Sequence, residues 1–171
     1  MESDYQSLFQ VRLANYDDIP AIMNITREAF VKYQQMSGVE KLAALEESYN
    51  DVKKDIDTKV VLLALSDGEP VGSVRVEVFP DKTAYLSRFA VKVTSQNNGI
   101  GKSIMNLVDK IMVKKGVTQI QLHTGSKITS LIRFYYGRGF YIESNSAVFL
   151  WSQYSAMDAL QIKITDWRED K

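Results

Sequence analysis

The chain has 171 residues, with 21 Lys and Arg against 21 Asp and Glu, so its formal net charge is zero. Hydrophobic residues make up 45% and charged residues 25% of the sequence, which is ordinary globular usage and excludes a disordered chain. A neutral chain argues against binding that rests on nucleic-acid phosphates or an anionic membrane, so we expect neither partner. The length predicts a single domain over residues 1–171.

Cysteine is missing from the sequence, and His123 is the single histidine. Disulfides, Cys-bound zinc, iron–sulfur clusters and Cys nucleophiles are therefore excluded, and we expect no metal site. The longest apolar run, residues 60–65, is far short of the roughly 20 residues that a membrane-spanning helix needs. The first residues lack the basic and apolar regions of a signal peptide, so we expect a cytoplasmic protein.

The N-terminal part of the chain predicts one strand and two helices. Residues 8–13 favour a strand, and apolar residues at steps of three and four over residues 19–33 predict a helix. Pro20 falls in the first turn of that helix, where backbone N–H groups have no helical partner. A second apolar stripe over residues 42–56 predicts another amphipathic helix.

The central part of the chain predicts three strands joined by turns. Residues 60–65 form a continuous apolar run, as expected for a strand that is covered on both faces. Residues 71–78 alternate between valines on one face and Ser73, Arg75 and Glu77 on the other. The third strand covers residues 84–93.

The C-terminal part returns to alternating helices and strands. Its expected elements are a helix at 100–115, a strand at 119–124, a short helix at 128–137, and late strands at 140–142 and 160–165. Residues 144–158 show no clear pattern. The whole order predicts an α/β fold with a mixed central sheet of about six to seven strands and about four helices.

A glycine loop joins the third central strand to the helix that follows it. Gly99 and Gly101 lie at the start of this helix, where the missing Cβ atoms let a ligand approach the backbone. The free N–H groups and the positive end of the helix favour an anion such as phosphate. A plain glycine turn is the structural alternative, and the spacing alone does not separate the two.

Three phosphate-binding patterns compete for this loop. The P-loop pattern matches at Gly101-Lys102-Ser103, but Gln96 stands where its first glycine belongs. The dinucleotide-binding fingerprint requires a third glycine where the chain has Ile104. The pattern Gln/Arg-x-x-Gly-x-Gly/Ala is matched at every fixed position by Gln96-Asn97-Asn98-Gly99-Ile100-Gly101.

With this loop the sequence resembles the GNAT superfamily of acyl-CoA N-acyltransferases. The strand end Phe89-Ala90-Val91 leads into the loop as it does in that family, and the family's second signature, Phe-Tyr-x-x-x-Gly-Phe, is matched by residues 134–140. The resemblance implies a GNAT-type fold in which strands 84–91 and 119–124 are parallel neighbours. These strands are expected to splay apart at their C-terminal ends and form the cofactor site.

The resemblance also implies acetyl-CoA as the cosubstrate, with no metal. Backbone N–H groups from Asn98 to Lys102 would hold the CoA pyrophosphate, and the backbone near Phe89 and Val91 would bind the pantetheine arm. The cofactor-binding residues expected from the resemblance are Phe89, Ala90, Val91, Gln96, Asn97, Asn98, Gly99, Ile100, Gly101, Lys102 and Ser103.

The reaction that the resemblance implies is direct attack of a neutral primary amine on the acetyl-CoA thioester. The amine must lose a proton and the leaving thiolate must gain one. By resemblance, Tyr135 of the second motif is the general acid, and packing as a core aromatic is its alternative role. The residues leave the proton acceptor open between Glu77, His123 and a water molecule.

The sequence leaves the acceptor amine open, whether it belongs to a small molecule or a peptide. The carboxylates Glu40, Glu46 and Glu47 would suit a cationic acceptor, whereas Arg75 and Arg88 would suit an acidic one. Two other functions also stay open: a non-catalytic CoA-sensing module on the same fold, and a P-loop-like nucleotide-binding protein. We expect a homodimer because the final segment gathers large apolar side chains, namely Phe149, Leu150, Trp151, Tyr154 and Trp167.

Overall fold

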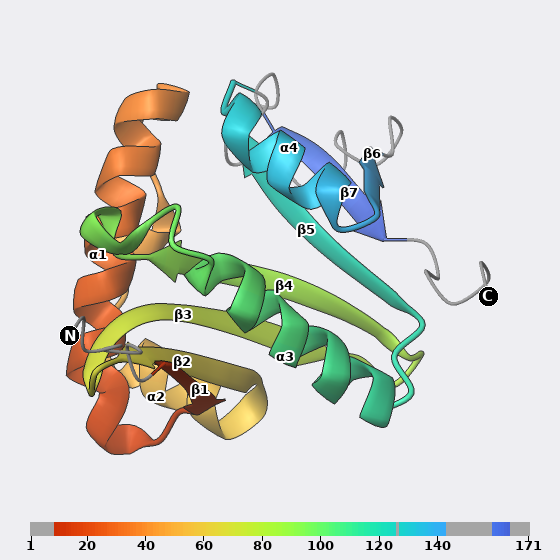
Figure 1. Cartoon of the computed structure of the whole chain (residues 1–171), viewed down its shortest axis with the longest axis horizontal. Helices are drawn as coiled ribbons and strands as arrows, with labels where there is room; N and C mark the ends of the chain where they lie inside the picture. Colours follow the sequence, from red (N-terminus) through yellow and green to blue (C-terminus); the bar gives the residue numbers. More distant parts are fainter. Residues whose placement is uncertain (1–8, 126, 143–158, 165–171) are drawn as a thin grey trace, which may run out of the picture.

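The protein is described by a computed structural model that covers residues 9–125, 127–142 and 159–164. Its helices and strands follow one another as β1 (Phe9–Leu13), α1 (Ile19–Ser37), α2 (Tyr49–Thr58), β2 (Val60–Ser66), β3 (Glu69–Val78), β4 (Thr83–Val91), α3 (Ile100–Lys114), β5 (Gln119–Gly125), α4 (Thr129–Gly137), β6 (Phe140–Ile142) and β7 (Ala159–Ile164). Over the described residues the strands form one seven-stranded sheet in the order β1-β2-β3-β4-β5-β7-β6 (Figure 1). The predicted α/β fold with a mixed sheet is confirmed.

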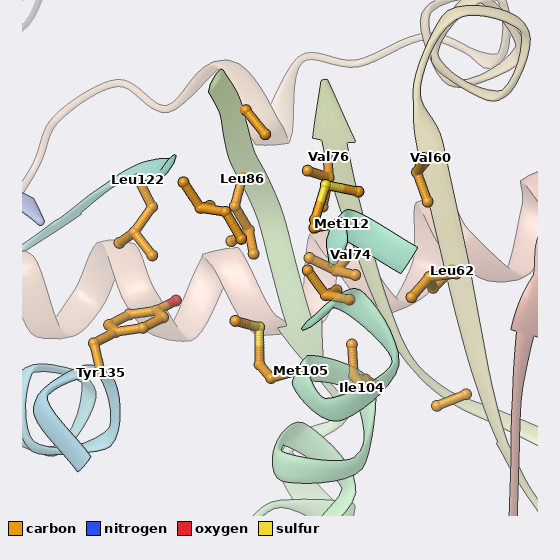
Figure 2. Packing of buried hydrophobic residues seen from close by; sticks show 14 of the residues in the cluster. Val60, Leu62, Val74, Val76, Leu86, Ile104, Met105, Met112, Leu122 and Tyr135 are labelled. Atoms are coloured by element: carbon orange, nitrogen blue, oxygen red, sulfur yellow. The ribbon is translucent and has the colours of Figure 1, made fainter. Parts of the chain in front are cut away.

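Two helical layers cover the sheet, and β2 shows why both are needed. Its residues Val60, Leu62 and Ala64 pack in the cluster that contains α3, whereas Val61 and Leu63 pack against α1 and α2. The continuous apolar run is therefore a strand buried on both faces, as predicted. Figure 2 shows the α3 side of this core, in which side chains from β2, β3, β4, β5, α3 and α4 meet.

The second predicted helix is interrupted in the structure. A short 3-10 turn at Ala43–Leu45 precedes α2, which begins only at Tyr49. The reason is local: Ser48 and Asp51 form a reciprocal capping box, in which each side chain accepts a hydrogen bond from the backbone N–H of the other. The apolar stripe continues across the break, so periodicity alone did not reveal it.

The parallel strands β4 and β5 diverge along their length. Residues 83–86 of β4 pair with residues 119–122 of β5, but the pairing stops there although both strands continue. Figure 1 shows the two ribbons separating toward α1, which crosses their open end. The splayed strand pair predicted from the resemblance is thereby confirmed.

A β-bulge on the other edge of β4 accompanies this divergence. Two consecutive β4 residues, Arg88 and Phe89, oppose the single β3 residue Val74. Arg88 adopts a φ of +52°, in the left-handed region that residues other than glycine seldom occupy. The bulge therefore bends β4 at the level where it has parted from β5.

Candidate active site

Two adjoining cavities open where β4 and β5 part. The larger, of about 630 Å³, lies between α1, the end of β4, the start of α3 and α4. The smaller, of about 240 Å³, lies between α1, residues 39–44, β4 and β5. They share four lining side chains, Phe30, Tyr33, Phe89 and Leu131, so they form one continuous site.

The N-terminus of α3 faces the larger cavity without a side-chain cap. Gly99 occupies the N-cap position at a φ of +77°, and Asn97 is also left-handed at +66°. The Ser103 N–H donates to the Gly99 carbonyl at 3.0 Å, so the N–H groups before it lack a helical acceptor. A Cβ at Gly99 would meet no atom within 4 Å, whereas one at Gly101 would lie 3.1 Å from Phe89 Cζ.

Among the described residues, every charged side chain that lines the larger cavity is positive. Four cationic side chains line it, and no Asp or Glu does. The four are Lys32 from α1, Lys102 from α3, Arg133 from α4, and Arg138 just after α4. This charge, added to the uncapped helix terminus, suits a ligand that carries several phosphate groups.

The predicted cofactor-binding residues divide into two groups in the structure. Eight of the eleven line the larger cavity: Phe89, Ala90, Val91, Gln96, Asn97, Gly99, Gly101 and Lys102. The side chain of Ile100 points into the core instead, while Asn98 and Ser103 are not part of the lining. The loop therefore lines the cavity with five of its residues and turns the side chain of Ile100 into the core.

Gln96 fastens the loop to two other elements. Its Nε2 donates to the Val91 carbonyl at 3.0 Å, and its Oε1 accepts from Lys32 Nζ at 3.1 Å. The amide therefore holds the end of β4, the loop and α1 together. This gives the glutamine of the motif a positioning role that its place in the sequence did not reveal.

Three of the four cations of the larger cavity were not predicted from the sequence. Lys32 and Arg133 belong to no motif, and only the packing of α1 and α4 beside the loop brings them to the site. Arg138 lies inside the second motif, so it could have been noticed. It donates to Asp109 Oδ2 at 2.7 Å and to Asn106 Oδ1 at 3.0 Å, which orients its guanidinium from α3.

Tyr135 reaches the smaller cavity from α4 and is only 4% exposed. Its ring packs edge-on against Phe140 and Phe134, with centroids 5.3 and 5.4 Å away. In Figure 2 its hydroxyl points away from α4. Burial raises the pKa of Tyr135 far above its usual 10.0, with a smaller contribution from Tyr33. Its neighbour Tyr136 is 49% exposed.

Two candidate proton acceptors of the sequence stand in different places. His123 on β5 lines the smaller cavity, and its Nδ1 lies 2.7 Å from the hydroxyl of Tyr85 on β4. Burial lowers the pKa of His123 below its usual 6.5, which favours the neutral imidazole. Glu77 lines neither of the two cavities, and its carboxylate lies 4.0 Å from Lys59.

The segment that precedes α2 forms one wall of the smaller cavity. Glu47 fixes it to the sheet, because its carboxylate binds Arg75 of β3 and Arg88 of β4. Arg75 is fully buried and therefore does not face the cavity as a ligand. Over the described residues, no group of three or more His, Cys, Asp or Glu side chains could hold a metal ion.

Parallel strands that splay apart beside an uncapped helix start are the arrangement expected of an acyl-CoA-dependent transferase. A family model described as "Acetyltransferase (GNAT) family" matches residues 19–140. The chain belongs to this family and is therefore an acyltransferase. Searched over its described residues, the structure contains no helix that is both long and apolar enough to cross a bilayer.

Several named proteins are similar to this chain. Spermidine N(1)-acetyltransferase of Thermoplasma acidophilum is 22% identical over 144 residues, which is 78% of this chain and 89% of that protein. The PaiA N-acetyltransferase from the same organism, solved in complex with coenzyme A, has a TM-score of 0.78 at 19% identity, covering 92% of this chain and 99% of its own. The ribosomal-protein-S18-alanine N-acetyltransferase of Escherichia coli has a TM-score of 0.71 at 15% identity, covering 93% and 94%.

Proposed function

We propose that the protein transfers an acetyl group from acetyl-CoA to a primary amine by direct attack on the thioester. The observation that carries this proposal is the larger cavity, which combines four cations, no described acidic side chain and the uncapped start of α3. The names of the similar proteins, which include N-acetyltransferases for spermidine and for a ribosomal protein, support N-acetyl transfer in general.

The residues of the larger cavity fit a CoA molecule. The N–H groups around Gly99 would hold the pyrophosphate, since that glycine leaves open space where other residues carry a Cβ. Lys32, Arg133 and Arg138 would bind the remaining phosphate charge. The backbone of β4 beyond its paired residues 83–86 has no partner in β5 and would bind the pantetheine arm as a strand does.

Acetyl-CoA supplies the activated acyl group, and the side chains of the smaller cavity handle protons. Tyr135 keeps its proton at neutral pH, since even its usual pKa of 10.0 lies well above 7 and burial raises it further, so it presents an O–H donor to the developing thiolate. The same raised pKa disfavours complete loss of that proton. We therefore assign to Tyr135 the role of a hydrogen-bond donor that stabilises the leaving thiolate, which takes up its proton from water.

His123 is our candidate for accepting the amine proton. Its pKa is lowered by burial, so the imidazole is neutral at physiological pH and able to take up a proton. Tyr85 fixes the ring through the contact to Nδ1. His123→Gln should lower kcat/KM and remove one titration from the acidic limb of its pH profile. If the acidic limb of the pH profile is unchanged in this variant, water is the proton acceptor.

A two-part experiment tests the proposed function. Acetyl-CoA at a hundredfold excess over its dissociation constant should stabilise the fold by about 2.7 kcal/mol, whereas ATP with magnesium should not. Release of free thiol should then depend on an added amine. A melting temperature that does not change with acetyl-CoA would reject the proposal. Binding without transfer to any amine would favour the CoA-sensing alternative.

A further inference from the structure

The charged side chains beside the smaller cavity form an alternating chain. Arg88 Nε donates to Glu47 Oε1 at 2.7 Å, and Arg75 donates to both Glu47 oxygens at 2.7 and 2.9 Å. Arg75 also donates to Asp55 at 2.8 Å, and Asp55 pairs with Lys59 at 3.1 Å. The chain of charges therefore runs from the surface, through a buried guanidinium, to a cation at the cavity wall.

Because of these ion pairs, the nearby carboxylates are not available to an amine in the smaller cavity. Both oxygens of Glu47 are held by guanidinium groups, so this residue is not available to a cationic acceptor. Glu46 is exposed and pairs with Lys41 at 3.5 Å. Over the described part of the chain, no Asp or Glu side chain lines the smaller cavity.

Counting the described residues alone, Arg88 is the one Lys, Arg, Asp or Glu side chain that lines this cavity. Only its Nε is used by Glu47, and within the described residues its Nη1 and Nη2 have no hydrogen-bond partner. The side chain is 26% exposed and lines the cavity. The remaining walls are mainly apolar and are formed by Phe30, Val39, Leu42, Ala44, Leu86, Phe89, Leu122 and Leu131.

We propose, resting on the proposed acetyl transfer, that the acceptor is a small amine with an apolar body and a carboxylate, which Arg88 binds. A guanidinium with free Nη groups matches the two oxygens of a carboxylate. A polyamine would instead bring a second cation beside Arg88, and no described carboxylate lines the cavity to balance it. The cavity volume of about 240 Å³ lies below the roughly 300–1,000 Å³ of drug-sized pockets, which favours a small acceptor.

The test compares L-phenylalanine with L-phenylalaninamide, which share the amine and the apolar body and differ in the carboxylate. Spermidine serves as the cationic acceptor. Thiol release gives kcat/KM for each amine, and calorimetry gives the affinity of the two N-acetylated products for the CoA-saturated protein. Product binding needs no turnover and avoids the different basicity of the two amines. We expect the carboxylate to improve product affinity, and kcat/KM calculated per neutral amine, by about tenfold or more.

Arg88→Gln and Arg12→Gln form the matched pair of variants. The first should reduce the preference for the carboxylate about tenfold, without adding backbone strain, since glutamine and arginine tolerate the left-handed φ equally poorly. Arg12 pairs with Asp18 and lines neither cavity, so its variant should keep the full preference. Circular dichroism confirms that each variant is folded.

The outcomes separate this inference from the proposed function. Faster transfer to spermidine, equal binding of the two products, or an unchanged preference in Arg88→Gln overturns the acceptor class, even if acetyl transfer occurs. Selective binding of N-acetyl-L-phenylalanine without transfer to any amine supports the acceptor class and rejects the catalytic proposal.

Discussion

Tyr135 shows at the residue scale that a core position and a chemical role can coincide. Its ring packs against Phe134 and Phe140, and Tyr135 also lines the smaller cavity. The same burial that stabilises the fold raises the pKa of the phenol and keeps it protonated. Packing and proton donation, which the sequence presents as alternatives, are therefore compatible at this position.

Tyr135→Phe tests the proposed donor. The variant keeps the ring and its packing, so acetyl-CoA affinity should stay close to that of the wild type. The single-turnover rate of acetyl transfer should fall by about 10²-fold, because the leaving thiolate loses its donor. Tyr136→Phe is the control, since that ring is exposed. A wild-type rate in Tyr135→Phe would make Tyr135 a packing residue only.

The raised pKa of Tyr135 also predicts a pH effect on stability. Above pH 10.0 the unfolded tyrosine loses its proton while the buried one keeps it. Ionisation therefore stabilises the unfolded state, and the free energy of unfolding falls. The stabilisation is complete below pH 10.0 and is lost as the pH rises toward the folded pKa. The melting temperature of the wild type should therefore fall more steeply above pH 10.0 than that of Tyr135→Phe.

At the element scale, the N-terminus of α3 is the place where we expect the larger cavity to bind the CoA pyrophosphate. Gly99 is the position at which to test this, because a Cβ there meets open space, whereas one at Gly101 would press on Phe89. Asn and Asp are the non-glycine residues that best tolerate a left-handed φ, so they make a matched pair. We expect Gly99→Asp to weaken CoA binding about tenfold more than Gly99→Asn does, because only Asp adds a negative charge. Equal affinities by calorimetry would place the pyrophosphate elsewhere.

The segment before α2 is a second part of the fold whose position depends on ion pairs. Glu47→Gln should lower the free energy of unfolding by about 3 kcal/mol, because buried Arg75 loses one of its two carboxylate partners. Glu46→Gln changes an exposed pair and should have little effect. Chemical denaturation measures both variants. Equal stabilities would mean that Asp55 alone satisfies Arg75.

Assembly is the property that remains to be tested at the scale of the whole molecule. The homodimer prediction rests on Phe149, Leu150, Trp151, Tyr154 and Trp167, which lie outside the described residues. Light scattering at micromolar concentration should give the mass of two chains. A monomer mass would show that these side chains serve another purpose. The single-domain organisation stays a prediction as well.

Local patterns predicted much of the sheet and of the glycine loop. The apolar run of β2, the alternation in β3 and the glycine that precedes α3 depend on neighbours in the sequence, so they could be interpreted directly. The capping box that starts α2 at Tyr49 was also local, yet the apolar stripe concealed it. Helical periodicity records which face is buried and not whether the helix is continuous.

The sequence by itself determined the fold class, through its hydrophobic periodicity, and the place of the glycine loop before α3. The parallel strand pair was expected from the resemblance to the GNAT superfamily that two motifs with fixed spacing carry. Only the tertiary structure decided which charges meet: it brings Lys32 and Arg133 to the loop, and it pairs Glu47 with two arginines. Ion pairs between distant segments depend on distance and burial in space, and neither quantity is encoded in local spacing.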